Sequence, residues 1–260
     1  MFRPRGMAGL FLACALSLFL PSLATGQNNQ LKPPLGFDLA SEMKALYGDY
    51  DVRSQTSSIE IPGGSPDTSN SWSVEAFSVA GFRDSGIDKV IVATYATPDD
   101  TPDFNCRACI PLIGAAIFAK TAKGWTVEAS EKPGFPDGFE GSPPDAKLIQ
   151  FGPHAYGIEL DYQVDGYDGY WTSTALFLPW RGGFGAALQL IGAQRSYEGC
   201  AQQPPCYLSQ SVLKFVPGNN SEYYHLLVTT TGAEPDTSKT GALKDVSGTK
   251  LLHFADGKYE

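Results

Sequence analysis

The alternation of hydrophobic and polar residues predicts a chain made mostly of short β-strands. From Trp72 onward, runs of β-branched and aromatic residues are separated by glycine, proline and aspartate, as in strands joined by tight turns. The run 89–97 is nearly apolar on both faces, which predicts a central strand. Strand and helix patterns do not alternate. We therefore predict an all-β fold, mainly an antiparallel meander, forming a sandwich, a barrel or a partial propeller.

Individual strands are expected wherever such runs lie between turn residues. The runs 112–119 and 124–129 predict a hairpin. The proline- and glycine-rich segment 132–145 predicts an exposed loop, and 51–70 is expected to be mostly loop. Further strands are expected at 72–79, 147–151, 156–163, 170–178, 184–191, 207–215 and 223–231, and from 249 to the end, with Asp256-Gly257 as the last hairpin turn.

One short N-terminal α-helix is expected within residues 37–50. Asp38 can cap its start and Gly48 can end it. Apolar residues recur at the spacing of one helix face, so this face should pack on a sheet. These apolar residues are Leu39, Met43, Leu46 and Tyr47.

The first residues have the layout of a secretion signal. Arg3 and Arg5 precede an apolar run, 7–20, that is shorter than the roughly 20 residues of a spanning helix. Small residues follow, so cleavage is expected after Ala24 or Gly26. The protein should then be exported to the periplasm or the extracellular space, without a transmembrane segment. The predicted organisation is a signal peptide (1–26), a flexible leader (27–36) and a single β-rich domain (37–260).

The charge of the mature chain argues against nucleic acid as a partner. Without Arg3 and Arg5 the chain has 17 basic and 28 acidic residues, a net charge of −11. Phosphate binding needs clustered lysine and arginine, and the sequence has no basic stripe.

Four cysteines remain after cleavage, and an even number in an exported chain predicts two disulfides. Three pairings are possible; we favour Cys106 with Cys109 and Cys200 with Cys206, because each closes a short loop. Poor helix-forming residues after Cys109 disfavour a redox motif, and Ile110 stands where c-type haem attachment needs histidine. Zinc would require all four thiolates. We expect neither metal nor cofactor.

The Cys106-Arg-Ala-Cys109 loop precedes a Gly-Ala-Ala-Ile-Phe strand, and the chain closes on Phe254-Ala-Asp-Gly-Lys-Tyr259. Together with the Gly-Tyr-rich middle, these motifs resemble exported, β-rich bacterial proteins of unknown function. The resemblance covers most of 70–260 and implies no activity or residue roles.

Two groups of residues are candidates for a site. Glu159 and Asp161 lie two apart on an expected strand and project from one face, so with Asp168 they could act as acid and base on a glycoside. The segment 162–171 places aromatic rings and carboxylates on a glycine-hinged loop that could bind a glycan or peptide. Its candidate binding residues are Tyr167, Asp168, Tyr170 and Trp171.

Familiar catalytic patterns are otherwise missing from the sequence. The three histidines, His154, His225 and His253, have no metal-binding spacing, and there is no Gly-x-Ser-x-Gly elbow. We therefore expect a non-catalytic binding or envelope-associated module. The alternative is a secreted hydrolase that uses the paired carboxylates, with glycans as its candidate substrates.

Overall fold

The computed structural model describes residues 34–61, 71–99, 110–166, 169–196, 208–218, 221–236, 238 and 242–260. These residues form one helix and sixteen strands, which confirms the predicted all-β class. The elements are α1 (Leu39–Tyr47), β1 (Tyr50–Asp51), β2 (Thr56–Glu60), β3 (Ser71–Asp84), β4 (Ile87–Pro98), β5 (Leu112–Thr121), β6 (Gly124–Pro136), β7 (Asp145–Gly152), β8 (Ala155–Gly166), β9 (Gly169–Trp180), β10 (Gly183–Ser196), β11 (Leu208–Val216), β12 (His225–Pro235), β13 (Leu243–Asp245), β14 (Gly248–Leu252), β15 (Phe254–Ala255) and β16 (Lys258–Tyr259).

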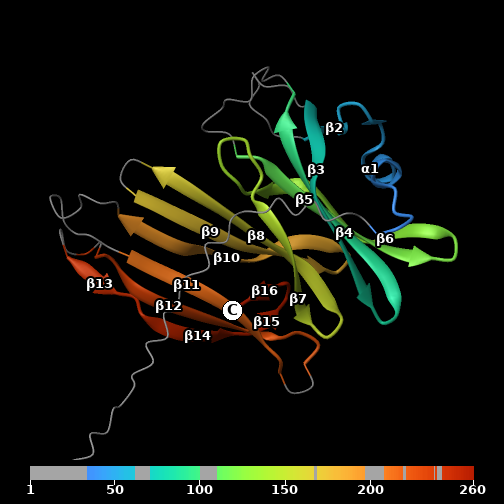
Figure 1. Cartoon of the computed structure of the whole chain (residues 1–260). Coiled ribbons are helices and arrows are strands. Elements are labelled where there is room, and N and C mark those ends of the chain that lie inside the picture. The colour runs from blue at the N-terminus through green and yellow to red at the C-terminus, as the bar shows by residue number, and fades with distance from the viewer. Residues whose placement is uncertain are drawn as a thin grey trace, which may run out of the picture.

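Two antiparallel meanders follow one another along the chain (Figure 1). The first sheet has the order β1-β2-β3-β4-β5-β6, and the second runs from β13 through to β7, with β14 also paired to β12. Neither sheet closes on itself. One face of the first sheet packs on one face of the second, so the sandwich is the architecture formed among those predicted.

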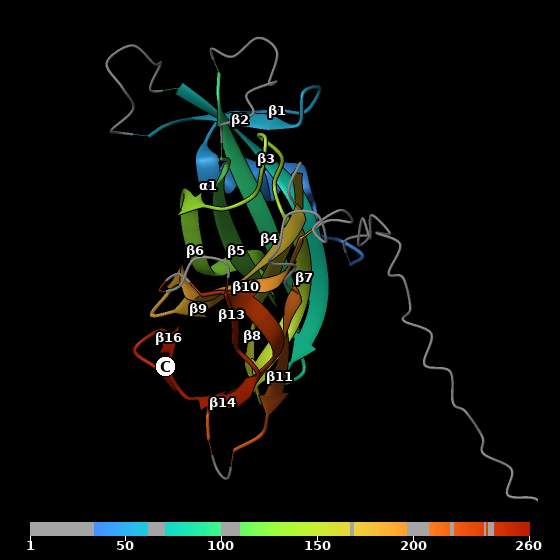
Figure 2. The same cartoon turned by 90° about the vertical axis from the view of Figure 1, so that its left-hand side faces the viewer.

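The core between the sheets is built by alternation along the central strands. On β4, Ile91 and Ala93 face the second sheet, whereas Val90 and Val92 face the helix. On β9, Phe177 faces the first sheet and Leu178 the opposite side. Since both strands are buried on both faces, the molecule has four layers: α1, the first sheet, the second sheet and the β15–β16 hairpin (Figures 1 and 2).

The helix α1 forms where the sequence predicts it. Asp38 accepts a hydrogen bond from the backbone N–H of Ala40 at 3.2 Å, and Gly48 ends the helix with φ of 91°. Met43 is fully buried against the first sheet. Tyr47 shares a 2.9 Å hydrogen bond with Thr94 of β4, which ties the end of the helix to the central strand.

The last hairpin covers the outer face of the second sheet. Asp256 and Gly257 have φ of 47° and 83°, as a two-residue turn with positive φ at both positions requires. Phe254 and Tyr259 on either side of the turn pack against Phe151, Leu226 and their neighbours.

Two segments differ from the sequence prediction. Residues 56–60, expected as loop, form β2 and pair with β3. Residues 132–136, also expected as exposed loop, continue β6. Prolines are tolerated there because β6 is the last strand of its sheet, so a missing N–H breaks no ladder on the outer side. The loop prediction was also wrong for Asp137, which is only 2% exposed.

Some predictions concern residues outside the described ranges. They are the signal peptide, most of the leader, and the cysteines Cys106, Cys109, Cys200 and Cys206. Within the described part of the chain, α1 is the only helix and is too short to cross a bilayer.

Removing the Met43 side chain should loosen the helix from the sheet. Met43→Ala leaves a cavity under α1, so we expect the free energy of unfolding to fall by about 2–5 kcal/mol. Lys44→Ala, at the exposed neighbouring position, is the matched control and should change it by no more than about 0.5 kcal/mol. Urea denaturation measures both, and equal losses would contradict the packing of this helix.

Candidate functional site

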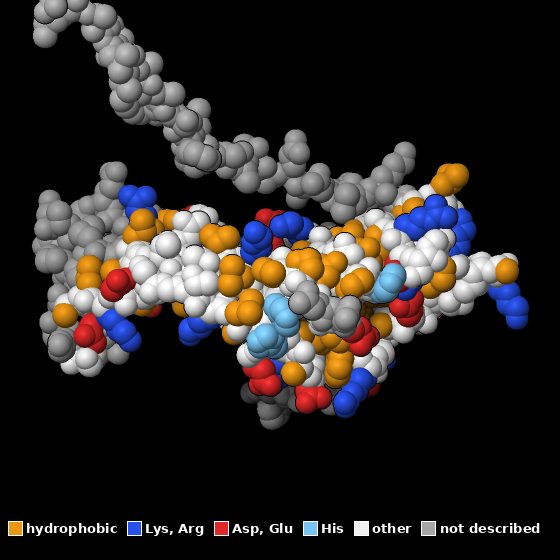
Figure 3. Space-filling view, turned by 90° about the horizontal axis from the view of Figure 1, so that it is seen from below, with side chains coloured by type: hydrophobic (Ala, Val, Ile, Leu, Met, Phe, Trp, Pro, Cys, Tyr) orange, Lys and Arg blue, Asp and Glu red, His pale blue; other side chains and the backbone are white. Residues whose placement is uncertain are grey.

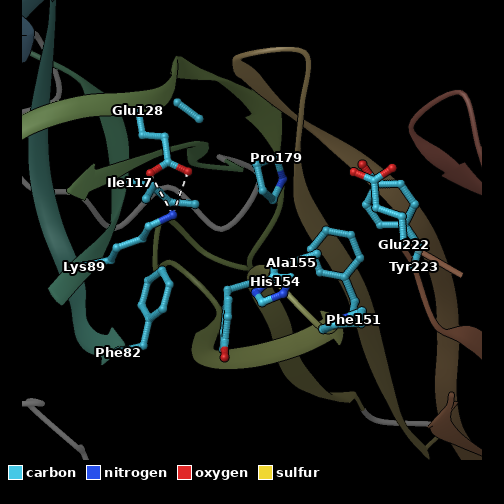
Figure 4. A pocket seen from close by; sticks show the side chains of 13 residues that line it. Phe82, Lys89, Ile117, Glu128, Phe151, His154, Ala155, Pro179, Glu222 and Tyr223 are labelled. Carbon is cyan, nitrogen blue, oxygen red and sulfur yellow. Dashed lines mark hydrogen bonds and ion pairs between the residues drawn. The ribbon is translucent and has the colours of Figure 1, made fainter. Parts of the chain in front are cut away.

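A cavity of about 210 Å³ lies at one end of the sandwich, between the two sheets (Figure 4). The first sheet contributes residues of β3, β4, β5 and β6. The other wall comes from the β7–β8 hairpin, Pro179 at the end of β9 and the loop before β12. The lining side chains are Phe82, Lys89, Ile117, Glu128, Ala129, Phe151, Pro153, His154, Ala155, Tyr156, Pro179, Glu222 and Tyr223.

The most unusual lining residue is Lys89, a lysine at the start of the most apolar strand. Its side chain is only 11% exposed. The ammonium nitrogen lies 3.1 Å from Oδ2 of Asp84 and 2.9 and 2.8 Å from the two oxygens of Glu128. These carboxylates come from the end of β3 and from a bulged position of β6. Two carboxylates from β3 and β6 of the same sheet therefore pair with one buried cation.

The pKa shifts agree with this arrangement. Burial lowers the pKa of Lys89, but hydrogen bonds and attraction to Glu128 and Asp84 outweigh it, so the pKa is raised overall. For Asp84, burial raises the pKa, and hydrogen bonds from His154 and Lys89 reverse the effect and leave the pKa below its usual value. Lys89 and Asp84 are therefore both charged at neutral pH.

Asp84 also holds His154, yet the arrangement is not a hydrolase triad. Nδ1 of His154 lies 2.8 Å from Oδ1 of Asp84 and 3.2 Å from the hydroxyl of Ser85. In a catalytic triad the acid and the nucleophile contact opposite nitrogens of the ring. Here both contact the same nitrogen, so the imidazole cannot pass a proton between them.

Aromatic rings line both sides of the cavity. Phe82 stacks on Tyr156 with ring centroids 4.5 Å apart, and Phe151 stacks on Tyr223 at 5.6 Å. In Figure 4, Lys89 and Glu128 lie on one side of the cavity, and Glu222 and Tyr223 lie on the other.

The loop that carries Glu222 is fixed to the β7 end. The backbone N–H of Tyr224 donates to the carbonyl of Phe151 at 2.7 Å. A Cβ at Gly152 would lie 2.3 Å from the carbonyl oxygen of Glu222, so only glycine permits this approach. The far wall of the cavity is therefore preformed.

The predicted carboxylates lie elsewhere on the second sheet. Glu159 pairs with Lys147 at 3.1 Å, and Asp161 accepts a 2.6 Å hydrogen bond from the hydroxyl of Thr174. Burial is the main cause that raises the pKa of Asp161, and the charge of Glu159 adds to it. Asp168 lies outside the described residues.

The predicted aromatic loop is described only in part. Tyr167 and Asp168 lie outside the described residues, whereas Tyr170 and Trp171 belong to β9. Trp171 packs edge-on against Tyr162 at 5.4 Å and is 37% exposed.

The residues that define the cavity were not predicted from the sequence. His154 was named only as one of three histidines without metal-binding spacing, and the structure places it in a turn. Asp84, Lys89 and Glu128 belong to three strands, and their meeting depends on strand pairing. One signal was available, because a charged side chain that starts a strand buried on both faces needs an opposite charge nearby.

A second buried polar group was also missed at the other end of the sandwich. Asp137 follows β6, and its Oδ1 accepts from the N–H of Gly138 at 3.1 Å. Its Oδ2 is buried and has no hydrogen-bond partner within the described residues. Burial raises its pKa to about 6, and the negative charge of Asp161 contributes.

The described residues contain no group of three or more histidines and acids that could hold a metal ion. His225 and His253 do meet, with their Nδ1 atoms 2.8 Å apart, but they lie as a pair. On the face seen in Figure 3, acidic and basic side chains are interspersed among hydrophobic ones.

Comparison with protein-family models, with curated proteins and with solved structures gave no match for this chain.

Replacing Lys89 should leave two carboxylates without their cation. Lys89→Met keeps an unbranched apolar side chain, one atom shorter and without the ammonium group, and we expect the free energy of unfolding at pH 7 to fall by about 1–3 kcal/mol. The control is Lys147→Met, because this lysine is 70% exposed in its pair with Glu159 and should contribute at most about 1 kcal/mol. Chemical denaturation gives both values; a loss no larger than the control's would refute a structural role for the buried ion pair.

Asp137 should make the protein less stable as the pH rises. Its carboxyl has a pKa of about 6 in the folded state, against an ordinary value of 3.8, so the folded state holds the proton more tightly. The Asp137 carboxyl therefore lowers the free energy of unfolding as it ionises. This loss of stability is absent below pH 3.8, grows between pH 4 and 6 and is complete above pH 6, where it amounts to about 3 kcal/mol.

Asp137→Asn should remove this pH dependence. We expect the difference in unfolding free energy between variant and wild type to move in favour of the variant from pH 4 to pH 7, as measured by denaturation at each pH. Asp145→Asn, an exposed aspartate at the start of β7, is the control. A constant difference across this range would contradict the raised pKa.

Proposed function

We propose that this protein is an exported, non-catalytic binding module that holds part of a small ligand in the cavity between its sheets. The observation that supports this most is the preformed cavity itself. It joins stacked aromatic pairs with a few charged groups held by hydrogen bonds, a combination typical of ligand sites.

The state of the charged groups favours binding over catalysis. Lys89 and Asp84 hold each other in their charged forms, and Asp84 also engages His154. A general acid or base needs a pKa near the working pH and access to the reacting proton. Paired groups of this kind fix the shape and charge of a pocket instead.

The size of the cavity limits the ligand. Pockets for drug-sized molecules enclose about 300–1,000 Å³. At about 210 Å³, this cavity suits one group of a larger ligand, such as a peptide side chain or a single glycan ring. The rest of the ligand would lie outside the cavity on the surface.

A secreted hydrolase remains the second candidate. The raised pKa of Asp161 supports it, because general acids are commonly buried carboxyl groups that retain their proton. The partner expected for it, Glu159, is instead engaged by Lys147.

A ligand-observed NMR screen of a fragment library tests the binding function. Ala155 lines the cavity at the start of β8, so Ala155→Leu should fill it and weaken fragment binding by about tenfold or more. Ala255→Leu, on the exposed hairpin strand β15, should bind as the wild type does. Denaturation of each variant verifies folding.

Two results would count against the binding function. If fragments bind Ala155→Leu and the wild type with equal affinity, their binding site lies outside the cavity. Cleavage of a glycan from the same library, abolished by Asp161→Asn, would instead support the hydrolase.

A further inference from the structure

We infer that the cavity binds an organic cation, an ammonium-type head group held between aromatic rings and carboxylates. This inference rests on the proposed binding function and adds the chemical class of the ligand. Three independent features of the cavity carry it: its charge, its aromatic lining and its size.

Carboxylates outnumber cations around the cavity. Lys89 is the lining residue with a fixed positive charge, and Asp84 behind it already matches that charge. Glu128 then adds a second negative charge beside the same ammonium, and Glu222 adds another on the opposite wall. No ion pair among the described residues neutralises Glu222. A positively charged ligand would therefore be attracted, and an anionic one repelled.

The aromatic lining suits the same class of ligand. An ammonium group near the face of an aromatic ring is attracted by the ring quadrupole, and rings grouped as a cage recognise quaternary ammonium ions. Phe82 with Tyr156 and Phe151 with Tyr223 supply two stacked pairs around this cavity. Such rings also accept the methyl groups of a quaternary ammonium, which water solvates poorly.

The size of the cavity selects a small head group. Its volume of about 210 Å³ lies below that of pockets for drug-sized molecules, which enclose about 300–1,000 Å³. Choline is of this size, and 3,3-dimethylbutan-1-ol has the same shape with carbon in place of the charged nitrogen. The two compounds therefore separate the effect of charge from that of shape.

The test is an NMR titration of the isotope-labelled protein with each compound. We expect choline to bind about tenfold more tightly than the alcohol, with shifts at residues that line the cavity. Raising the salt concentration should weaken choline binding and leave the alcohol unchanged, because only the cation is screened.

Two variants test the residues involved. Glu222→Gln removes one charge without changing the shape of the side chain, so it should weaken choline binding severalfold and leave alcohol binding unchanged. Phe82→Leu keeps the apolar wall but removes a ring, and should affect choline more than the alcohol. Glu60→Gln on β2, an exposed glutamate that does not line the cavity, should change neither.

The outcomes distinguish this inference from the proposed function. Equal affinity for the two compounds, or binding of the alcohol alone, would overturn the cation preference and leave a binding cavity in place. If Glu222→Gln leaves the affinity for choline unchanged, the charge of Glu222 does not contribute to binding, and the role inferred for it is wrong. If neither compound binds while neutral fragments bind in a manner that Ala155→Leu weakens, the cation inference fails and the proposed function stands. If the fragment screen also fails, both are wrong.

Discussion

A buried ammonium group sets the form of one end of this protein. Lys89 lies near the start of β4, the strand that both layers of the core share, so its side chain enters the space between the sheets. A charge in that position costs several kcal/mol unless it is paired. Asp84 and Glu128 supply the pairing from neighbouring strands, and three charged side chains cannot close as tightly as the aliphatic core beyond them. We infer that the cavity results from this pairing. The two sheets pack closely where the facing side chains are apolar, and they lie further apart where Lys89 and its carboxylate partners need room.

Among the described residues, the buried charged side chains Asp84, Lys89 and Asp137 lie at the ends of the sandwich. Lys89 is opposite Ala119, near one end of β5, whereas Asp137 follows Pro136, which is opposite Leu112 at the other end. Between them the facing strands contribute isoleucine, alanine and phenylalanine. The middle of the sandwich is therefore an apolar core, and the buried charged groups lie toward its ends. At the cavity end, the buried Lys89 and Asp84 are paired with each other. At the other end, Oδ2 of Asp137 has no hydrogen-bond partner within the described residues.

How far the sequence alone could predict this structure depends on the range of the interactions. The helix cap at Asp38, the stop at Gly48 and the turn at Asp256-Gly257 are local, and each was predicted from neighbouring residues. The buried strand β4 was predicted from its composition. The prolines of 132–136 misled the prediction, because proline breaks a strand only where its N–H is needed, and β6 lies at the edge of the sheet.

The candidate site could not be predicted in the same way. Asp84 and Lys89 lie across one hairpin, but Glu128 and His154 reach them only through sheet pairing and sheet packing, and Glu222 reaches the opposite side of the cavity on a docked loop. Glu159 and Asp161 attracted attention because same-face spacing is visible in a sequence, whereas their surroundings are not. In the structure, Glu159 forms an ion pair with Lys147, and Asp161 accepts a hydrogen bond from the hydroxyl of Thr174.

Sequence spacing therefore identifies which carboxylates project from the same face of a strand. Only the packing of the sheets decides which of them lie at the same cavity. In this protein the carboxylates that face one cavity are far apart along the chain. This arrangement depends on the whole sandwich, because the buried lysine and its two carboxylate partners come from three separate strands.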